Sequence, residues 1–173
     1  MRISKVESKD LEILRSFAER TFRLAFEADN DPVRFEEYCR KAFFLEQFRV
    51  ELDHPASGFW FYWEGDFLAA YLKLNFDKHP EALNSGRTVQ VERLYVEPSM
   101  QGRKIGEQLL DFALEQAIAN QAELIWLSVW QANPPALRFY ERCGYEIFGT
   151  KTFWLGDEAQ TDWLVRKKVP SLK

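Results

Sequence analysis

The stretch LYVEPSMQGRKIGEQLL, residues 94–110, joins an apolar segment to an amphipathic one through a short basic loop. Before the loop, TVQVERLYV at 88–96 has the alternation and the β-branched residues of a strand. After it, residues 103–120 carry apolar side chains along one side of a helix. The sequence therefore predicts a strand that turns into a helix at QGRKIG.

This loop combines glycine with positive charge. The start of a helix exposes unpaired backbone N–H groups at the positive end of the helix dipole. Gly102 and Gly106 remove side chains where a ligand comes close to the backbone. Arg103 and Lys104 add two cations, so the loop predicts a pyrophosphate site. Two glycines that allow tight packing would leave the same pattern, and the loop is neither GxxxxGK[ST] nor the full GxGxxG.

Turn residues and hydrophobic periodicity divide the rest of the chain into short elements. Their expected order is a strand, two helices, three strands, a helix, a strand, a helix and two strands. This order predicts one α/β domain, residues 1–173, with a mixed, mostly antiparallel sheet. The elements expected before 88 are a strand at 2–6, helices after 8–10 and after 31–32, a hairpin across 58–76 and a polar loop at 79–86. Those expected after 120 are a strand at 124–130, a helix that starts after 133–135 and ends at 143–144, and strands at 145–155 and 161–169 around an acidic turn at 156–160.

The two N-terminal helices should bury apolar faces. Asp31 offers an N-cap for the second helix, and Pro32 suits its first turn. Much later in the chain, Gly144 is the expected terminator of the helix that ends at 143–144. The side chains expected to face the core are Leu11, Leu14, Phe17 and Phe22 in the first helix, and Phe35, Tyr38, Cys39, Phe43 and Phe44 in the second.

Composition excludes several classes of protein. With 173 residues, 46% apolar and 16% aromatic, the chain can build one sizeable core. A net charge of −4 argues against non-specific nucleic-acid binding. The charged N-terminus has no signal-peptide pattern, and no stretch approaches the roughly 20 apolar residues of a membrane span. Cys39 and Cys143 match no metal or redox spacing, so we expect two buried thiols, no metal site and a cytoplasmic protein.

The series VERLYVEP, QGRKIGEQLL and LIWLSVWQANPPALRFYERCGYE resembles the GNAT superfamily of N-acetyltransferases along its cofactor-binding half. Gln101, Lys104 and Gly106 occupy the three signature positions of the family's Q/R-x-x-G-x-G/A loop, with Lys104 where glycine is usual. Asn133, Ala136 and the run FYERCGY at 139–145 resemble the segment N-x-x-A-x-x-F-Y-x-x-x-G-F/Y.

The GNAT resemblance implies a fold and a co-substrate. The sheet should open between the fourth strand, 88–96, and the fifth, 124–130, and acetyl-coenzyme A should lie in that opening. The resemblance assigns 1–87 to the acceptor-binding half and 88–173 to the acetyl-CoA-binding half. It implies coenzyme contacts from the backbone of Leu94, Tyr95 and Val96, from the loop Gln101, Gly102, Arg103, Lys104, Ile105 and Gly106, from Asn133 and Ala136, and from Arg142 unless that side chain forms a surface salt bridge.

Two side chains are candidates for proton transfer during acyl transfer to an amine. The resemblance places Tyr140 beside the coenzyme sulfur as the acid, although an FY pair on a small helix is also common in cores. Glu92 is the candidate base, because strand alternation lets it face the cleft while Val91 and Arg93 do not. A surface Glu paired with an Arg or Lys is the alternative. A backbone N–H near Val96, freed by a bulge just before Pro98, should stabilise the oxyanion.

The acceptor is less well defined by the sequence. Four segments, at 21–43, 71–75, 125–140 and 153–165, look like PaiA-type acetyltransferases, a group associated with the polyamines spermidine and spermine. We therefore expect a primary amine, with a polyamine first. A protein N-terminus, another small amine and a catalytically silent CoA-binding regulatory protein remain alternatives, and a homodimer is left open. Residues that could line the acceptor site are the acids Glu27, Asp29, Asp31, Glu36 and Glu37 and the aromatics Phe26, Tyr38, Phe43, Trp60 and Tyr62, which do not assign a substrate.

Overall fold

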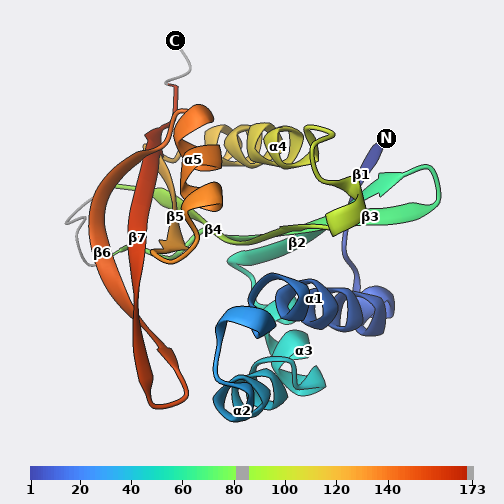
Figure 1. Ribbon diagram of the computed structural model, residues 1–173. Coiled ribbons are helices and arrows are strands. Elements are labelled where there is room, and N and C mark those ends of the chain that lie inside the picture. The colour runs from blue at the N-terminus through green and yellow to red at the C-terminus, as the bar shows by residue number, and fades with distance from the viewer. Residues whose placement is uncertain (81–85, 171–173) are drawn as a thin grey trace.

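The computed structural model describes residues 1–80 and 86–170 and contains one central sheet with helices on both faces (Figure 1). The strands are β1 (Arg2–Lys5), β2 (Ser57–Glu64), β3 (Phe67–Asn75), β4 (Thr88–Val96), β5 (Leu124–Trp130), β6 (Glu146–Leu155) and β7 (Glu158–Lys168). The helices are α1 (Leu11–Phe26), α2 (Pro32–Ala42), α3 (Leu45–Asp53), α4 (Ile105–Ala119) and α5 (Pro134–Arg142).

The sheet has seven strands in the order β1-β2-β3-β4-β5-β7-β6. All neighbours pair antiparallel except β4 and β5, which run parallel. A parallel pair needs a crossover, and α4 supplies it between these two strands. The predicted mixed, mostly antiparallel α/β sheet is confirmed.

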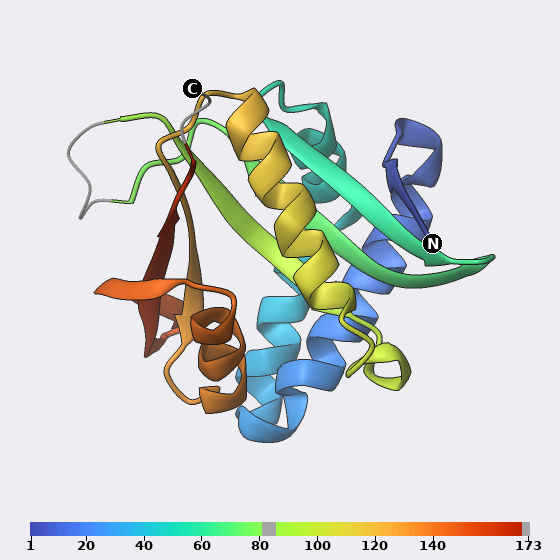
Figure 2. The same cartoon turned by 90° about the horizontal axis from the view of Figure 1, so that it is seen from above.

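Two hydrophobic cores lie on opposite faces of the sheet because side chains alternate along each strand. In β2, Phe59 and Phe61 pack toward α1, α2 and α3, while Trp60 and Tyr62 pack toward α4. Figure 2 shows α4 crossing one face of the sheet, with the N-terminal helices beyond it. The α1–α3 face is rich in aromatic rings, and this face holds the cavity described below.

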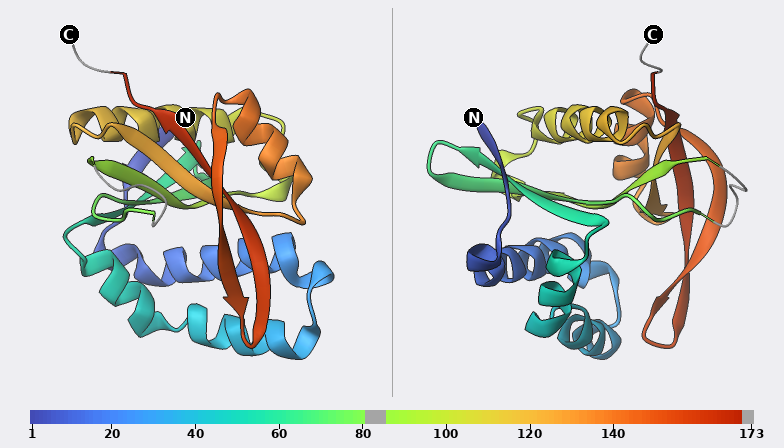
Figure 3. Two further views of the ribbon diagram at one scale, coloured as in Figure 1. Left: turned by 90° about the vertical axis from the view of Figure 1, so that its left-hand side faces the viewer. Right: turned by 180° about the vertical axis from the view of Figure 1, so that it is seen from behind.

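The hairpin of β6 and β7 reaches from the α5 side of the sheet to the N-terminal helices (Figure 3). Its turn lies against α2, where Arg34 forms ion pairs with Asp157 at 2.7 Å and Glu158 at 3.4 Å. Gln160 also donates to Asn30, which follows α1, at 2.8 Å. The hairpin therefore closes one side of the space between the sheet and α1–α2.

Local signals located most elements correctly. Asp31 accepts hydrogen bonds from Val33 and Arg34 N–H at the start of α2, and Gly144 has φ +84° at the end of α5, as predicted. The acidic turn is shorter than expected, because β7 begins at Glu158. The predicted loop at 79–86 lies largely outside the described residues.

The second predicted helix was wrong at its C-terminal end. The chain leaves helical geometry at Phe44, whose ψ is 133°, and a separate helix α3 follows. Phe44 was expected in the core but is 63% exposed, whereas Phe43 is buried with Phe48 of α3. The break lets α3 turn back onto the sheet, where Phe48 contacts Phe59 of β2.

Candidate active site

Strands β4 and β5 lie side by side only where they begin. They pair from Thr88 and Leu124 to Gln90 and Trp126. Beyond these residues β4 remains paired with β3 and β5 with β7, so the two strands separate. The sheet therefore opens between strands 4 and 5, as predicted.

Backbone groups of β4 face this opening. The N–H of Glu97 donates to Ala69 of β3 at 2.8 Å. Because backbone groups alternate sides along an antiparallel strand, the N–H groups of Leu94 and Val96 point away from β3 and into the opening. Consistently, the Gln101 side chain reaches the Val96 carbonyl from that side at 3.4 Å. By the same alternation the N–H of Tyr95 points toward β3, so this residue contributes its ring to the site.

The expected bulge just before Pro98 was wrong. Pairing with β3 is regular from Arg93 to Val96, and the register shift lies between Arg93 and Val91. Glu92 is thus the extra residue of β4. The amide of Val96 faces the opening through ordinary strand alternation, not through a local bulge.

The bulge at Glu92 also changes which side chains share a face. Simple alternation would place Glu92 and Arg93 on opposite faces of the sheet. Instead both face the α1–α3 side, where Arg93 lies 5.1 Å above the Phe48 ring and both line one cavity. Val91 packs into the opposite core. An extra residue in a strand moves the following side chains to the other face.

The loop between β4 and α4 has the backbone of an anion-binding turn. Gly102 has φ +78°, and Lys104 has φ +61° at the N-cap of α4. Lys104 therefore adopts the left-handed conformation even though it replaces the family's usual glycine. No side chain caps α4 within the described residues, so its first N–H groups remain available to a ligand.

Gly106 and Ile105 contribute to the packing of α4. A Cβ at Gly106 would come within 2.9 Å of the Phe139 ring, so this glycine allows α4 to approach α5. The packing interpretation of Gly106 is thus supported alongside the ligand interpretation. The side chain of Ile105 is buried in the core, which leaves only its backbone for a ligand, while Arg103 is exposed.

The start and end of α5 hold the other predicted coenzyme contacts. The Asn133 side-chain oxygen accepts from the Ala136 N–H at 3.2 Å and caps the helix. This cap occupies Oδ1 and leaves the Asn133 amide NH₂ for a ligand. Arg142 is exposed at the other end of α5 and forms no ion pair in the part of the chain that the structure describes.

Tyr140 is half-buried between two other rings. Its ring centroid lies 5.1 Å from that of Phe139 and 5.9 Å from that of Tyr145. Burial raises the pKa of the Tyr140 hydroxyl above its ordinary value, so this group keeps its proton at neutral pH. A protonated phenol fits an acid better than a base.

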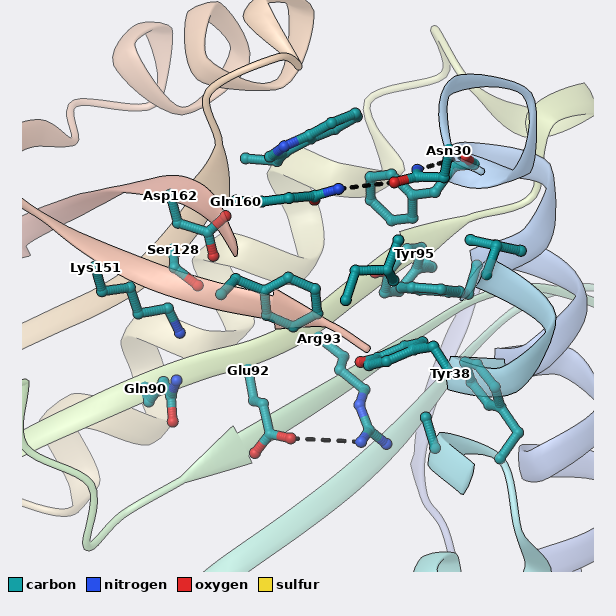
Figure 4. Close-up of a pocket in the computed structure, with 18 of the residues that line it drawn as sticks. Asn30, Tyr38, Gln90, Glu92, Arg93, Tyr95, Ser128, Lys151, Gln160 and Asp162 are labelled. Carbon is teal, nitrogen blue, oxygen red and sulfur yellow. Dashed lines mark hydrogen bonds and ion pairs between the residues drawn. The ribbon is translucent and has the colours of Figure 1, made fainter. Parts of the chain in front are cut away.

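A cavity of about 350 Å³ lies between the sheet and the α1–α2 layer, in the size range of small-molecule sites. Figure 4 shows polar side chains from β4, β5, β6 and β7 on its walls. Residues of both predicted halves therefore build it. The lining residues are Phe22, Phe26, Asn30, Phe35, Tyr38, Ala42, Phe43, Tyr71, Gln90, Glu92, Arg93, Tyr95, Ser128, Trp130, Lys151, Phe153, Leu155, Gln160 and Asp162.

Four charged side chains, Glu51, Lys73, Glu92 and Arg93, form a cluster beneath this cavity, and the last two also line it. Lys73 donates to Glu51 at 2.8 Å and to Glu92 at 2.9 Å. Asn75 also donates to the other oxygen of Glu92. Arg93 contacts Glu51 at 2.9 Å and Glu92 at 3.5 Å. Glu92 thus lines the cavity and is also paired with Lys and Arg.

Two charged cavity residues were not found from the sequence. Lys151 of β6 and Asp162 of β7 are cross-strand neighbours, and both project into the cavity (Figure 4). Asp162 is only 7% exposed. The available signal was an acid at an inward position of TDWLV, where Leu164 and Asp162 share one face.

The acidic acceptor candidates from the helices lie away from this cavity. None of them lines the cavity. Among the aromatic candidates, Phe26, Tyr38 and Phe43 do line it, whereas Trp60 and Tyr62 pack on the opposite face of the sheet. The acids have other partners or positions: Glu27 and Glu36 contact Arg23, Glu37 contacts Lys41, Asp31 caps α2, and Asp29 lies in the turn after α1.

Comparison with known proteins identifies the family. Residues 14–145 match the Acetyltransferase (GNAT) family. An uncharacterized N-acetyltransferase in the pepI 3′ region of Lactobacillus delbrueckii subsp. lactis is 32% identical over 169 residues, 98% of each chain. The chain belongs to the GNAT acetyltransferase family. It is therefore an acyltransferase, and acetyl-CoA is the acyl donor of that family.

More distant GNAT proteins resemble parts or all of the chain. The spermine/spermidine N(1)-acetyltransferase of Bacillus subtilis is 31% identical over 94 residues, 53% of this chain and 60% of that protein. A paia N-acetyltransferase from Thermoplasma acidophilum, solved with coenzyme A, superposes with a TM-score of 0.75 at 20% identity. The superposition covers 96% of this chain and 98% of that one, and it shows the shared fold.

Several groups of this GNAT protein are suited to bind acetyl-CoA. Uncapped amides at the start of α4 and the exposed cations Arg103 and Lys104 suit the diphosphate. The N–H groups of Leu94 and Val96 face the opening between β4 and β5, where amide groups of a pantetheine arm can pair with strand backbone. These groups come from the segments that carried the family resemblance.

Two further findings concern the described residues as a whole. Across 1–80 and 86–170, no group of three or more His, Cys, Asp or Glu side chains is arranged to hold a metal ion. In the same ranges, no helix has both the length and the apolar character needed to cross a membrane.

The two cysteines differ in burial. Cys39 is buried as expected, whereas Cys143 is half-buried.

Proposed function

We propose that this acetyltransferase moves an acetyl group to the primary amine of a small molecule, by direct attack in a ternary complex. One observation carries the proposal. The aromatic cavity is lined by Glu92, Arg93 and Tyr95 of β4 and by Ser128 and Trp130 of β5, the two strands whose separation forms the donor cleft. An amine in the cavity would therefore meet a thioester held in the cleft.

Residues of the chain can serve each charge change in this reaction. Acetyl-CoA supplies an activated acyl carbon and a thiolate leaving group. The N–H of Val96 is the proposed donor to the carbonyl oxygen, where negative charge would grow, while the N–H of Leu94 pairs with the pantetheine arm. Such an oxyanion donor is worth about 3–4 kcal/mol in other enzymes. Tyr140 holds a proton that it can give to the departing sulfur. Direct attack by the amine needs no covalent enzyme intermediate, and neither cysteine lines the cavity.

A polyamine such as spermidine or spermine is the acceptor class that we propose first. Similarity to the Bacillus spermine/spermidine N(1)-acetyltransferase supports it, although that similarity covers about half of this chain. Aromatic walls suit an aliphatic amine, and two carboxylates, Glu92 and Asp162, line the cavity. The acceptor pocket draws on both 1–87 and 88–173.

A second acceptor class is favoured by the cations of the same cavity. Arg93 and Lys151 line it, and they offset the two carboxylates. A small amine that also carries an anionic group would pair with such cations, whereas a polycation would be repelled by them. The positive charge of Lys151 should therefore favour binding of an anionic amine and disfavour binding of a polyamine.

The test measures thiol release from acetyl-CoA with a panel of amines: spermidine, spermine, amino acids, aminoalkyl acids, amino sugars and a peptide N-terminus. Lys151→Met should improve kcat/KM for a polyamine and weaken it for an anionic amine. Turnover with a peptide alone would transfer the proposal to protein N-termini. Silence across the panel, with coenzyme bound in calorimetry, would instead support a regulatory CoA-binding protein.

Tyr140→Phe tests the proposed acid. It should lower kcat by about 10²- to 10⁴-fold while coenzyme affinity stays unchanged. Equal losses in both would indicate a packing role between Phe139 and Tyr145. We further propose a cytoplasmic location, because the two cysteines are unpaired. Labelling of the unpaired thiols in intact cells by a membrane-impermeant reagent would contradict this location.

A further inference from the structure

Asp162 differs from every other carboxylate near the proposed acceptor. It lines the cavity with a side chain that is almost fully buried. Within the described residues it forms no ion pair, whereas Glu92 is held by Lys73 and Arg93. A buried acid without a paired cation is costly to fold, so such groups usually serve a function.

The carboxylate of Glu92, by contrast, already has a hydrogen-bond partner at each oxygen. One of its oxygens accepts from Lys73 at 2.9 Å, and the other accepts from Asn75. Arg93 adds a second cation at 3.5 Å. Both oxygens are therefore already hydrogen-bonded to protein groups, so an acceptor ammonium would have to displace one of these partners. Its position matches the sequence-based prediction of a base, but its partners match the structural alternative.

The surroundings of Asp162 perturb the pKa of its carboxyl group. Burial raises the pKa of the Asp162 carboxyl, while Lys151 and the neighbouring Ser128 act to lower it, and the net direction is upward. The groups that face it are Lys151 from β6, Ser128 from β5, Glu92 and Arg93 from β4 across the cavity, and the phenols of Tyr38, Tyr71 and Tyr95. A base is more effective as its pKa approaches the working pH.

Asp162 also lies near the proposed reaction centre. It is the cross-strand partner of Trp130, the last residue of β5, at the open end of the cleft between β4 and β5. In Figure 4 its carboxylate lies next to Ser128 on the cavity wall. An amine that enters between the aromatic rings would have this carboxylate on one side and the cleft ahead.

We propose that Asp162 is the general base that removes a proton from the acceptor ammonium before attack. This inference rests on the proposed amine acetyltransferase function. Asp162 takes one proton from nitrogen, and the freed electron pair forms the C–N bond while the carbonyl π pair moves to oxygen. When this pair re-forms the carbonyl, the C–S bond breaks and Tyr140 protonates the sulfur. Tyr140 then recovers a proton, through water, from the positively charged nitrogen. One proton then leaves Asp162 for solvent, which balances the transfer.

The test compares Asp162→Asn, Glu92→Gln and the control Asp66→Asn on the best amine of the panel. Asp66 is exposed in the turn between β2 and β3 and does not line the cavity. Asp162→Asn should lower kcat/KM by about 10²- to 10⁴-fold near neutral pH. The loss should shrink toward about pH 10, where the amine deprotonates in solution. Asp66→Asn should match the unaltered protein.

Two readouts separate a base from a structural residue. Asp162→Asn should keep coenzyme affinity and raise Tm, because it removes an uncompensated buried charge. If this variant fails to fold, Asp162→Ala with added formate replaces it, and formate should restore part of kcat. Loss of activity that no pH and no formate repairs, together with a lower Tm, would overturn the assignment.

The remaining outcomes also decide the question. Near-normal kcat/KM in Asp162→Asn across the pH range would exclude Asp162 as the base. A pH-dependent loss in Glu92→Gln alone would assign the base to Glu92, as the sequence predicted. If the unaltered protein acetylates no amine although it binds coenzyme, the proposed function itself fails, and that result is distinct from any variant's result.

Discussion

Replacing Lys73 by methionine would test the charged cluster beneath the acceptor cavity. The Lys73 side chain is 4% exposed, and its Nζ lies 2.8 Å from Glu51 and 2.9 Å from Glu92. Removing one partner of a buried ion pair costs about 3–5 kcal/mol, because the remaining charges stay desolvated. In a domain of this size, about 1 kcal/mol changes Tm by about 2–4 °C. Lys73→Met should therefore lower Tm by about 6–20 °C.

The chain offers a matched control for this change. Lys41 contacts Glu37 at 2.9 Å, nearly the same distance, but the two side chains are 69% and 51% exposed. Such an exposed helical pair contributes about 0.3–0.5 kcal/mol, so Lys41→Met should change Tm by at most about 2 °C. The two variants differ in burial and not in the type of pair.

Differential scanning calorimetry of both variants measures the difference. Lys73→Met leaves the buried cluster with two carboxylates, Glu51 and Glu92, and one cation, Arg93. The double variant Lys73→Met/Glu51→Gln should recover part of the lost Tm, since it restores the charge balance. Equal Tm values for Lys73→Met and Lys41→Met would refute the reasoning. They would mean that water reaches the cluster and screens it despite its burial.

Three further outcomes can be checked on purified protein. Lys104→Gly should be about 1 kcal/mol more stable in urea unfolding than Lys104→Ala, because only glycine adopts a φ near +61° without strain; equal stabilities would contradict the left-handed turn. Gly106→Val should push the Phe139 ring away and abolish coenzyme binding in calorimetry while the far-UV spectrum is kept; retained binding would count against the loop. Arg93 and Lys73 hold the pKa of the Glu51 carboxyl below its ordinary value of 4.5, although burial acts to raise it. The ionised Glu51 therefore contributes its full stabilisation above pH 4.5, and this contribution is lost as the pH falls through the lowered pKa. Glu51→Gln should make Tm depend less on pH in this acidic range.

Structural features that depend on residues adjacent in the sequence were predictable from it. Asp31 and Pro32 start α2 through local bonds, and Gly144 ends α5 through a positive φ. The loop before α4 was recognisable because its glycines and cations lie within six residues. These signals act over one turn of chain, so they are independent of the rest of the fold.

Features that depend on distant partners were not predictable. No glycine or proline marks the break at Phe44, and α3 is placed by the packing of Phe48 on β2. The cavity residues Lys151 and Asp162 come from a hairpin that is far in sequence from α1 and α2. Their proximity follows from the strand order β5-β7-β6, which one sequence does not specify.

Glu92 and Asp162 illustrate the limit most clearly, because both are acids within apolar strands. Strand alternation treats them alike, yet the bulge at Glu92 brings Arg93 onto its own face and within 3.5 Å. With Lys73 beside it, Glu92 becomes part of a compensated cluster that supports the cavity floor. Asp162 meets only a hydroxyl and one lysine that stays outside ion-pair distance among the described residues. A compensated acid stabilises the fold, and an uncompensated one remains free to take a proton, so pairing across the sheet separates the two roles.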